Sequence, residues 1–343
     1  MKLFAILAAG AMARVSSNFF QMQNDFAEAA KLGVDVANLR AFRKYENDFA
    51  KKYKTAEERR LRAQTFSKNY EMIMQHNQRE DVTWKMGLNF DADLSFAEFQ
   101  SQYLMVNQDC SATSTRHLDI DVLSLPENFD WREHGGVSPV KNQGHCGSCW
   151  TFSTTGCLES AHLIHHNQAF NLSEQQLVDC AQDFDNHGCN GGLPSHAFEY
   201  IHYIGGLEEE KDYAYHAEEG LCEFDPTKTA GTVREVFNIT ETDEDQLTIA
   251  LAYFNPVSVV FEVVDGFRFY KEGVYQSDTC GSGPTDVNHA VLAVGYGTCK
   301  KCNTPYYIVK NSWGAEWGDE GFFKIKRGEN MCGIATCASF PIV

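Results

Sequence analysis

Two kinds of hydrophobic pattern divide the chain. From about residue 38 to residue 77 the sequence is highly charged, contains no proline or glycine, and is rich in alanine, leucine and phenylalanine. This pattern predicts two amphipathic helices. After about residue 237, runs of β-branched and aromatic residues predict strands at 256–261, 290–295, 306–310 and 321–326. Helices first and antiparallel-type strands later predict an α+β protein with two lobes.

Two more helices are predicted between these regions. Residues 149 to about 166 read as a helix with Trp150 and Cys157 on its apolar face. The next helix is expected to begin after Ser173, whose side chain would cap it while Gln176 reaches back to complete a capping box. We find no internal repeat along the chain.

One stripe of side chains marks the second of the charged helices. Its members recur at steps of three or four residues, which places them on one helix face. They are Glu58, Arg62, Phe66, Asn69, Ile73 and Asn77. Such a stripe alone indicates only a packed face. Residues 100–124, rich in serine, threonine and aspartate, are interpreted as a loop and a processing zone.

The first thirteen residues have the pattern of a secretory signal peptide. A basic start and an apolar run are followed by small residues at Ala11 and Ala13, although Ala9 and Ala11 would also serve for cleavage. The run is shorter than the ~20 residues of a membrane span. We therefore expect no membrane attachment. An apolar strand of the fold is the competing interpretation.

Charge and cysteine content narrow the class further. Residues 1–124 contain 16 basic and 16 acidic side chains, whereas residues 125–343 contain 13 and 31 and so carry the whole formal charge of −18. A body this acidic argues against nucleic-acid or membrane partners and suits an acidic compartment. Twelve cysteines behind a signal peptide predict an oxidising compartment and several disulfides.

Cys149 is the candidate nucleophile. Thiol catalysis needs a thiolate, although a free cysteine has a pKa of about 8.5. A helix amino terminus and a neighbouring imidazolium both lower that pKa. Cys149 lies at the predicted start of a helix, after the glycine-rich residues 143–148. Zinc or redox chemistry at Cys146 and Cys149 is the rival interpretation, but zinc would need a second cysteine pair at suitable spacing.

The imidazole is expected from His289, which opens a predicted strand and would be rigidly held. Asn311 follows another predicted strand, and its amide could orient the imidazole. Trp313 could shield that hydrogen bond from water. The chain order cysteine, histidine, asparagine is one known for thiol proteases.

These residues together resemble the papain family of cysteine peptidases. The resemblance lies in residues 143–150, 288–290 and 311–314, and it extends over nearly everything after residue 125. It implies a helical lobe and a β-barrel-like antiparallel lobe with the site in the cleft between them. It also implies peptide and protein substrates, inhibition by cystatin-type proteins, a monomeric enzyme, and no cofactor or metal.

The family's residue roles carry over one by one. The resemblance makes Cys149 the nucleophile, His289 the acid and base, and Asn311 the group that orients it. The side chain of Gln143 and the backbone N–H of Cys149 would stabilise the oxyanion. The residues expected by resemblance to bind substrate are Gly191, Gly192, Leu193, Pro194, Val260, Val287, Ala290 and Trp313.

The upstream stripe resembles the helix motif of propeptides in the cathepsin L and H branch. This implies residues 1–13 as signal peptide, 14–124 as an inhibitory propeptide and 125–343 as the peptidase domain. A second propeptide motif is imperfect. Gly87, Asn89 and Asp93 match it, but Asp91 stands where a phenylalanine is expected, and Phe90 comes one place early.

Within the family, residues 149–156, 177–189 and 288–297 are similar to cathepsin H and the plant aleurains. Residues 108–113 resemble the cathepsin H mini-chain, a propeptide fragment retained in the cleft, here about 106–113. The resemblance implies a bridge from Cys110 to Cys337 and a terminal carboxylate on Thr113 that pairs with a substrate α-ammonium. The chain would then be mainly an aminopeptidase with some endopeptidase activity.

Two alternatives to an aminopeptidase stay open. Cys110 could be a spare thiol in a cathepsin L-like endopeptidase, or the chain could be a catalytically silent binding homologue.

By resemblance, the remaining bridges are Cys146–Cys189, Cys180–Cys222 and Cys280–Cys332, with Cys157 a free buried thiol. Cys299 and Cys302 depart from the family, and a local bridge, two free thiols and a metal site are considered in that order. Asn171 and Asn238 are candidate glycan sites, and a lysosome-like vacuole or secretion is the expected destination.

Overall fold

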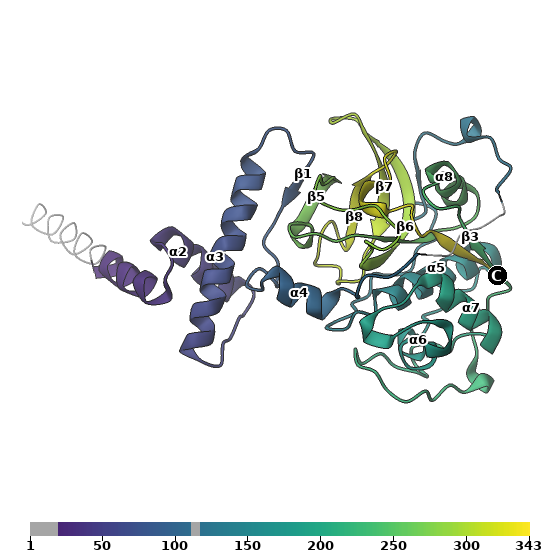
Figure 1. Ribbon diagram of the computed structural model, residues 1–343, viewed down its shortest axis with the longest axis horizontal. Helices are drawn as coiled ribbons and strands as arrows, with labels where there is room; N and C mark the ends of the chain where they lie inside the picture. Colours follow the sequence, from purple (N-terminus) through teal and green to yellow (C-terminus); the bar gives the residue numbers. More distant parts are fainter. Residues whose placement is uncertain (1–19, 111–116) are drawn as a thin grey trace, which may run out of the picture. The chain divides into compact units, whose positions relative to one another are not determined.

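The computed structural model describes residues 20–110 and 117–343 (Figure 1). These form two compact units, one built from residues up to Glu80 with Gly87–Ser95, the other from Asp81–Met86 with Phe96–Val343. The expected signal peptide, residues 1–13, and the end of the expected mini-chain, residues 111–113, lie outside the described part. No described helix is long and apolar enough to cross a membrane.

The smaller unit contains both charged helices predicted from the sequence. These are α2 (Val36–Asp48) and α3 (Ala56–Gln78), and residues 20–32 are also helical. Each labelled helix begins with a side chain that accepts a backbone N–H, Asp35 for α2 and Thr55 for α3. The α2 ring of Phe42 packs on the α3 ring of Phe66, with 5.4 Å between ring centroids.

The stripe on α3 anchors the return segment Gly87–Ser95. The Asn69 amide donates to the carbonyls of Ala92 and Leu94 at 2.9 and 2.8 Å. Asp93 is buried and accepts hydrogen bonds from the hydroxyls of Tyr45 and Tyr53, both at 2.8 Å. The second motif therefore acts through its aspartate here, a point that the imperfect match around residue 90 had left open.

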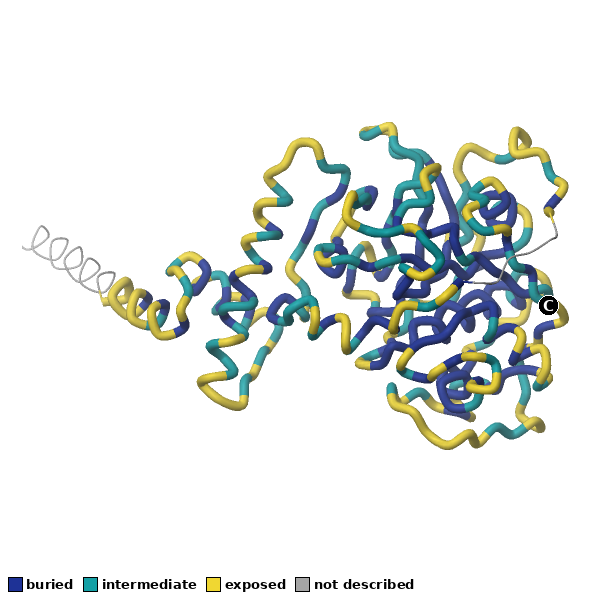
Figure 2. The backbone as a smooth tube through the Cα atoms, viewed as in Figure 1, coloured by how far each residue is buried: buried dark blue, intermediate teal, exposed yellow. Residues whose placement is uncertain are grey.

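The larger unit holds the remaining helices and the sheet. Its α-helices are α4 (Phe96–Tyr103), α5 (Cys149–His166), α6 (Glu174–Cys180), α7 (Pro194–Ile204) and α8 (Glu244–Tyr253). Short 3-10 turns are η1 (Val122–Ser124), η2 (Gln182–Phe184), η3 (Gly188–Asn190), η4 (Pro226–Lys228), η5 (Phe267–Phe269) and η6 (Met331–Gly333). Helix α5 spans the residues predicted for it, and most of its length is buried (Figure 2).

The capping box predicted for α6 is only half present. The Ser173 hydroxyl accepts the Gln176 N–H at 3.0 Å, as expected. The Gln176 side chain, however, donates to the Tyr200 hydroxyl and the Gly206 carbonyl. It does not reach back because the Ser173 N–H already donates to the Glu208 carbonyl at 3.0 Å.

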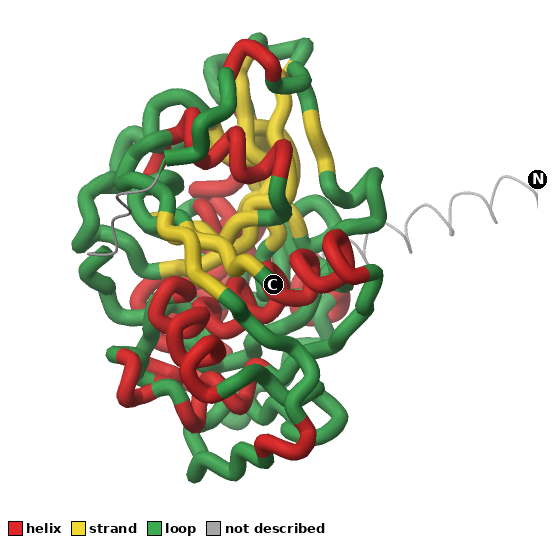
Figure 3. The backbone as a smooth tube through the Cα atoms, turned by 90° about the vertical axis from the view of Figure 1, so that its right-hand side faces the viewer, coloured by secondary structure: helices red, strands yellow, loops and turns green. Residues whose placement is uncertain are grey.

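The described residues form one sheet of nine strands, drawn in yellow in Figure 3. The strands are β1 (Trp84–Met86), β2 (Phe129–Asp130), β3 (Glu235–Asn238), β4 (Val257–Phe261), β5 (Tyr270–Tyr275), β6 (His289–Cys299), β7 (Thr304–Lys310), β8 (Phe322–Lys326) and β9 (Ser339–Ile342). The order is β1-β5-β8-β7-β6-β4-β9-β3, with β2 on β6. All pairings are antiparallel except β5 with β8.

Helix α5 is fastened to the centre of this sheet. The Ser153 hydroxyl donates to the carbonyl of Val291 in β6 at 2.7 Å, and the Ser258 hydroxyl of β4 donates to the Ser153 carbonyl at 3.0 Å. Both contacts are buried, where an unpaired polar group would be costly. They fix the start of α5, at Cys149, beside the start of β6, at His289, and the end of β7, before Asn311.

Candidate active site

Cys149 is the first residue of α5 and is completely buried. No side chain caps this helix, so its amino-terminal N–H groups remain directed toward the end where the sulfur lies. The Cys149 Sγ accepts a hydrogen bond from the Ala290 N–H at 3.3 Å. The fold thus supplies donors for an anionic sulfur from both the helix and the sheet.

His289 begins β6 and Asn311 follows the last residue of β7. Their side chains meet, with 2.8 Å between His289 Nε2 and Asn311 Oδ1. The Trp313 ring stacks on the imidazole, with 4.6 Å between centroids. Because an amide oxygen only accepts, Nε2 carries the proton in the neutral ring and Nδ1 keeps its lone pair. Within the described residues, the buried Nδ1 has no hydrogen-bond partner, which leaves it available to exchange a proton.

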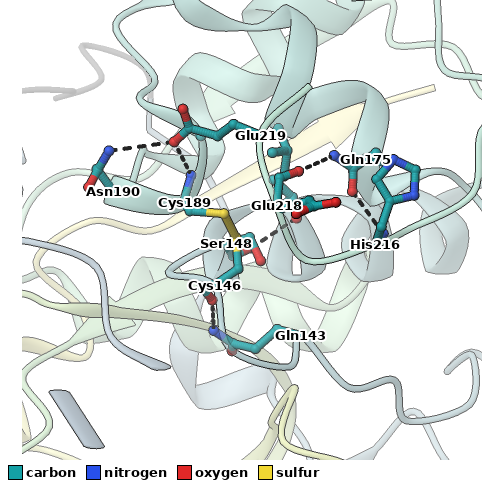
Figure 4. Close-up of a disulfide and its surroundings, with 12 residues drawn as sticks. Gln143, Cys146, Ser148, Gln175, Cys189, Asn190, His216, Glu218 and Glu219 are labelled. Atoms are coloured by element: carbon teal, nitrogen blue, oxygen red, sulfur yellow. Dashed lines mark hydrogen bonds between the residues drawn. A yellow bond between two sulfur atoms is a disulfide. The ribbon is translucent and has the colours of Figure 1, made fainter. Parts of the chain in front are cut away.

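Gln143 is held so that its amide nitrogen is aimed. Its backbone N–H donates to the Ser312 carbonyl at 2.8 Å, and its Oε1 accepts the Ser312 hydroxyl at 2.7 Å. Its Nε2 donates to the Cys146 carbonyl at 2.7 Å, in a loop anchored by the Cys146–Cys189 disulfide (Figure 4). The second donation, at 2.8 Å, goes to the carbonyl of Tyr103. A carbonyl oxygen therefore already occupies the position where Gln143 would bind an oxyanion.

The chain that supplies this carbonyl runs across the site. The Met105 N–H donates to the Asn288 carbonyl at 3.1 Å, and the Val106 N–H donates to the Asn190 carbonyl at 3.0 Å. Gly191 has φ +127°, and a side chain there would meet the Met105 Cβ at 2.7 Å. Only glycine lets the two backbones come this close. Residues 103–108 are thus hydrogen-bonded to both the helical part and the strand part of the unit.

Burial keeps the thiol and the imidazole neutral in this form. It raises the pKa of Cys149 to about 12, against the opposing effect of the Ala290, Trp150 and Met105 N–H groups. It lowers the pKa of His289 to about 4, against the hydrogen bond with Asn311. The helix terminus alone would lower the pKa of the thiol, but the loss of water on burial beneath residues 103–108 has the larger effect and raises it. In this form, burial therefore disfavours the thiolate that catalysis needs.

The residues expected to bind substrate are spread around this centre. Leu193 and Pro194 line a small pocket with Asn238 and Ala338, and Val260 pairs with Ala290 across strands β4 and β6. The remaining members contact either residues 103–108, called the covering chain from here on, or the core. Gly192 lies against Asn186 and Trp150, and the Val287 carbonyl accepts the Gln108 N–H.

Sequence reasoning missed three residues that contribute contacts to the site. Ser312 holds Gln143, the carbonyl of Asn288 binds Met105, and the Tyr215 hydroxyl donates to the Gln143 carbonyl at 2.7 Å. Ser312 and Asn288 stand beside recognised residues, so their positions were visible but their contacts were not. Tyr215 lies 72 residues from its partner, and nothing in the local sequence indicates the contact.

The structure contains the four long-range disulfides expected by resemblance. They are Cys110–Cys337, Cys146–Cys189, Cys180–Cys222 and Cys280–Cys332, and a fifth joins Cys299 to Cys302. Cys149 and Cys157 are free and buried. Of the candidate glycan sites, Asn171 is exposed, whereas Asn238 lies half-buried in β3.

The fold and this site define a cysteine peptidase held in precursor form. The model of the papain family cysteine protease matches residues 125–342, and that of the cathepsin propeptide inhibitor domain matches residues 42–99. The chain belongs to the papain family of cysteine proteases, as a zymogen close to cathepsin H and aleurain.

Known proteins of the aleurain and cathepsin H types resemble the chain over most of its length. An aleurain-like thiol protease from Arabidopsis thaliana is 49% identical over 329 residues, which cover 96% of this chain and 90% of the relative. Pro-cathepsin H from Mus musculus is 50% identical over 315 residues, 91% of this chain and 93% of the relative. The digestive procathepsin L2 proteinase from the larval midgut of Tenebrio molitor superposes with a TM-score of 0.81 at 36% identity, over 89% of this chain and 100% of that structure.

Proposed function

We propose that Cys149, His289, Asn311 and Gln143 are the catalytic residues of this protease. Once residues 103–105 leave, water returns to the site, and the proton of Cys149 moves to His289 Nδ1. The support is geometric: a thiol at a helix amino terminus, an imidazole with one nitrogen fixed by Asn311, and an amide donor aimed by Ser312.

The reaction follows from these positions. The thiolate attacks the substrate carbonyl, and Gln143 and the Cys149 N–H stabilise the oxyanion. His289 gives its proton to the departing amine, which leaves an acyl-enzyme. Water attacks next, its proton passing to His289, and the acid product departs as the thiolate is restored.

The mature enzyme acts mainly as an aminopeptidase in this proposal. The observation that carries it is the Cys110–Cys337 bond, which ties the covering chain to the peptidase body. Between that bond and the site, the N–H groups of Gln108 and Cys110 donate to the Val287 and Pro284 carbonyls at 3.1 and 2.9 Å. If proteolysis frees residues 106–113, the disulfide retains them in the cleft, and a carboxylate at Thr113 selects substrates with a free α-ammonium.

Two reporters test this specificity. Acid-activated enzyme should cleave a free-amine aminoacyl reporter faster than its N-acetylated form. Cys110→Ser should reverse that preference, because the fragment would be lost after cleavage. A Cys299→Ser/Cys302→Ser variant also loses one disulfide and should keep the preference. An acetylated substrate cleaved faster by the unmodified enzyme would instead support a cathepsin L-like endopeptidase.

A silent binding homologue is the remaining alternative. Thiol alkylation of the activated protein separates it from an enzyme, since the active thiolate should react at Cys149 alone. Equal labelling of Cys149 and Cys157 would contradict the proposed catalysis, because Cys157 is a core thiol whose sulfur lies 3.0 Å from the Pro256 carbonyl.

The remaining features of the proposal concern processing and location. Residues 1–13 direct the chain into the secretory pathway, residues 14–124 are the propeptide, and residues 125–343 form a monomeric peptidase domain open to cystatin-type inhibitors. A lysosome-like acidic vacuole suits the charge of −18. N-terminal sequencing of protein purified from its native compartment tests the boundaries.

A further inference from the structure

The disulfide Cys299–Cys302 lies outside the peptidase site. It joins the end of β6 to the turn before β7, the same hairpin whose other end carries His289 and Asn311 (Figure 1). At about 3.3 Å per strand residue, the bond is about 30 Å from His289 along β6. Its chemistry can therefore change without touching catalysis.

This bond is not needed to hold the hairpin. Its cysteines are three residues apart, whereas the other four bridges span 42 to 227 residues. A cross-link restricts the unfolded chain less when its loop is shorter. Moreover, Cys299 already pairs with Thr304 in the β6–β7 ladder. Opening the bond should leave the fold in place.

The surroundings of the bond favour thiol–disulfide exchange with a defined direction. Both cysteines are partly exposed, and Lys300 and Lys301 between them are exposed. The Cys302 N–H donates to the Cys299 Sγ at 3.1 Å. Nearby positive charge and this donor stabilise a thiolate on Cys299, which makes it the better leaving group. An incoming thiolate should then attack Cys302.

A pocket of about 510 Å³ adjoins the bond, and Cys299 and Lys300 are among its lining residues. Aromatic rings of Phe129, Tyr296 and Tyr306 line it as well. Its volume lies within the range of about 300–1,000 Å³ for small-ligand sites. Every lining residue comes after residue 125, so removal of the propeptide would not dismantle it.

Charges of both signs face this pocket. Lys300 and Lys324 can bind carboxylates, and Glu133 can bind an ammonium group. Asp130 is paired with Arg132 at 2.7 Å and is thereby neutralised. Two cations with one available anion match a small peptide that carries two carboxylates and one amine.

We propose that Cys299–Cys302 and its pocket form a thiol–disulfide exchange site for a small anionic peptide thiol, such as glutathione. One thiolate attacks Cys302 Sγ, forms a mixed disulfide, and breaks the Cys299–Cys302 bond. Cys299 leaves as a thiolate and takes a proton. A second peptide thiol then releases Cys302 as a thiol and forms the peptide disulfide, so two electrons and two protons pass to the protein. The site is independent of the peptidase centre and goes beyond the proposed proteolysis.

Selective reduction tests the site in the full-length chain carrying Cys149→Ser, which removes the competing active thiol. The probe is reduced glutathione, followed by alkylation of the native protein and peptide mapping. Cys299 and Cys302 should be labelled at least about tenfold faster than Cys180 and Cys222. That second bridge is the stringent comparison, because Cys222 is also exposed. Equal rates, or earlier opening of Cys180–Cys222, would overturn the proposal.

Charge variants test the pocket itself. Lys300→Gln combined with Lys324→Gln should slow the reaction with glutathione about fivefold or more beyond the loss seen with neutral 2-mercaptoethanol, which reports only the effect of Lys300 on the leaving group. Lys301→Gln is the control for leaving-group charge, since it removes a neighbouring charge outside the pocket lining and should slow the reactions with both thiols alike. An equal loss in the control, or an equal loss with both thiols, would show unspecific exposure and refute binding.

Discussion

Gln143 makes five polar contacts through its backbone and side chain, to Ser312, Cys146, Tyr103 and Tyr215. Its amide nitrogen is therefore set before any substrate arrives, which is the condition for stabilising an oxyanion without reorganisation. In the zymogen, the Tyr103 carbonyl uses the same donor. The Gln143 amide that should stabilise the oxyanion is therefore already occupied by a carbonyl of the propeptide.

Replacement of Gln143 by alanine should lower kcat about 100- to 1,000-fold with little change in KM, because the donor acts on the oxyanion and not on the ground-state substrate. Steady-state kinetics of the activated variant provide the measurement. Ser312→Ala should have a smaller effect in the same direction, since it loosens Gln143 without removing it. A normal kcat for Gln143→Ala would refute this role.

The two pKa shifts predict how reactivity depends on pH before and after activation. In the zymogen, a thiol with a pKa of about 12 and an imidazole with a pKa of about 4 are both neutral between those values. Alkylation of Cys149 should then be slow at neutral pH and rise only in strong base. The activated enzyme should show a bell-shaped profile, because low pH protonates the thiolate and high pH deprotonates His289. Activity rising steadily to about pH 10 would contradict the ion pair.

How far residue-scale predictions can reach has a physical reason. Cys149, His289 and Asn311 could be proposed because each stands in a distinctive local sequence at an element boundary, and the structure brings the last two together at 2.8 Å. Tyr215 and Gln176 could not be assigned in this way. Their partners are chosen by tertiary packing, as with the Gln176 amide bound to Gly206.

At the scale of elements, helix α4 leads into residues 103–108, and its grip on the peptidase domain holds them at the site. Its Phe99 ring meets the Trp313 ring edge-on at 5.2 Å, and its last carbonyl, on Tyr103, is the one bound by Gln143. That carbonyl is an orphan of the helix end, so the protein satisfies it with a catalytic donor. The sequence predicted only a loop from residue 100 onward, because α4 is too short for periodicity to reveal.

Phe99→Ala should weaken this grip, since truncation of a buried aromatic costs about 3–5 kcal/mol where the site cannot collapse. We expect faster acid activation and measurable peptidase activity in zymogen kept at neutral pH. A time course of reporter cleavage after acidification gives the rate. Gln100→Ala, at an exposed position of the same helix, is the control. Identical activation rates for both variants would exclude α4 as the grip.

The strands show the same limit of prediction. Strands β4 and β6 were recognised because central strands buried on both faces are continuous apolar runs, and β7 shares this pattern in its second half. Strand β8 was recognised although its burial alternates, because its sequence is rich in aromatic and β-branched residues. By contrast, β3 and β9 are four residues each and pair with one another at the edge of the sheet. Their pattern is too short to separate from a loop, and only the ladder defines them.

At the scale of the whole molecule, the chain divides into two compact units, each with its own buried contacts. In the smaller unit, the buried Asp93 carboxylate accepts both tyrosine hydroxyls and forms an ion pair with Lys51 at 2.9 Å. Its removal takes the acceptor from the Tyr53 hydroxyl and leaves the Tyr45 hydroxyl and the Lys51 ammonium with the Phe90 carbonyl alone. A surface pair such as Glu57 with Arg60, by contrast, contributes little.

Asp93→Ala should therefore destabilise the smaller unit by about 1–3 kcal/mol or more while sparing the larger one. Limited proteolysis of zymogen carrying Cys149→Ser should cut within residues 20–95 sooner than in the parent chain. Glu57→Ala serves as the control and should match the parent. Unchanged protection in Asp93→Ala would show that the aspartate does not hold the unit together.

The central claim is that a cysteine peptidase keeps a piece of its own propeptide beside the nucleophile through Cys110. Intact-mass analysis of acid-activated enzyme, denatured with and without reduction, tests it most directly. Reduction should release a short peptide containing Cys110 from a body containing Cys337. An activated enzyme that releases no such peptide on reduction, and whose sequence begins after Cys110, would show that no propeptide fragment is kept.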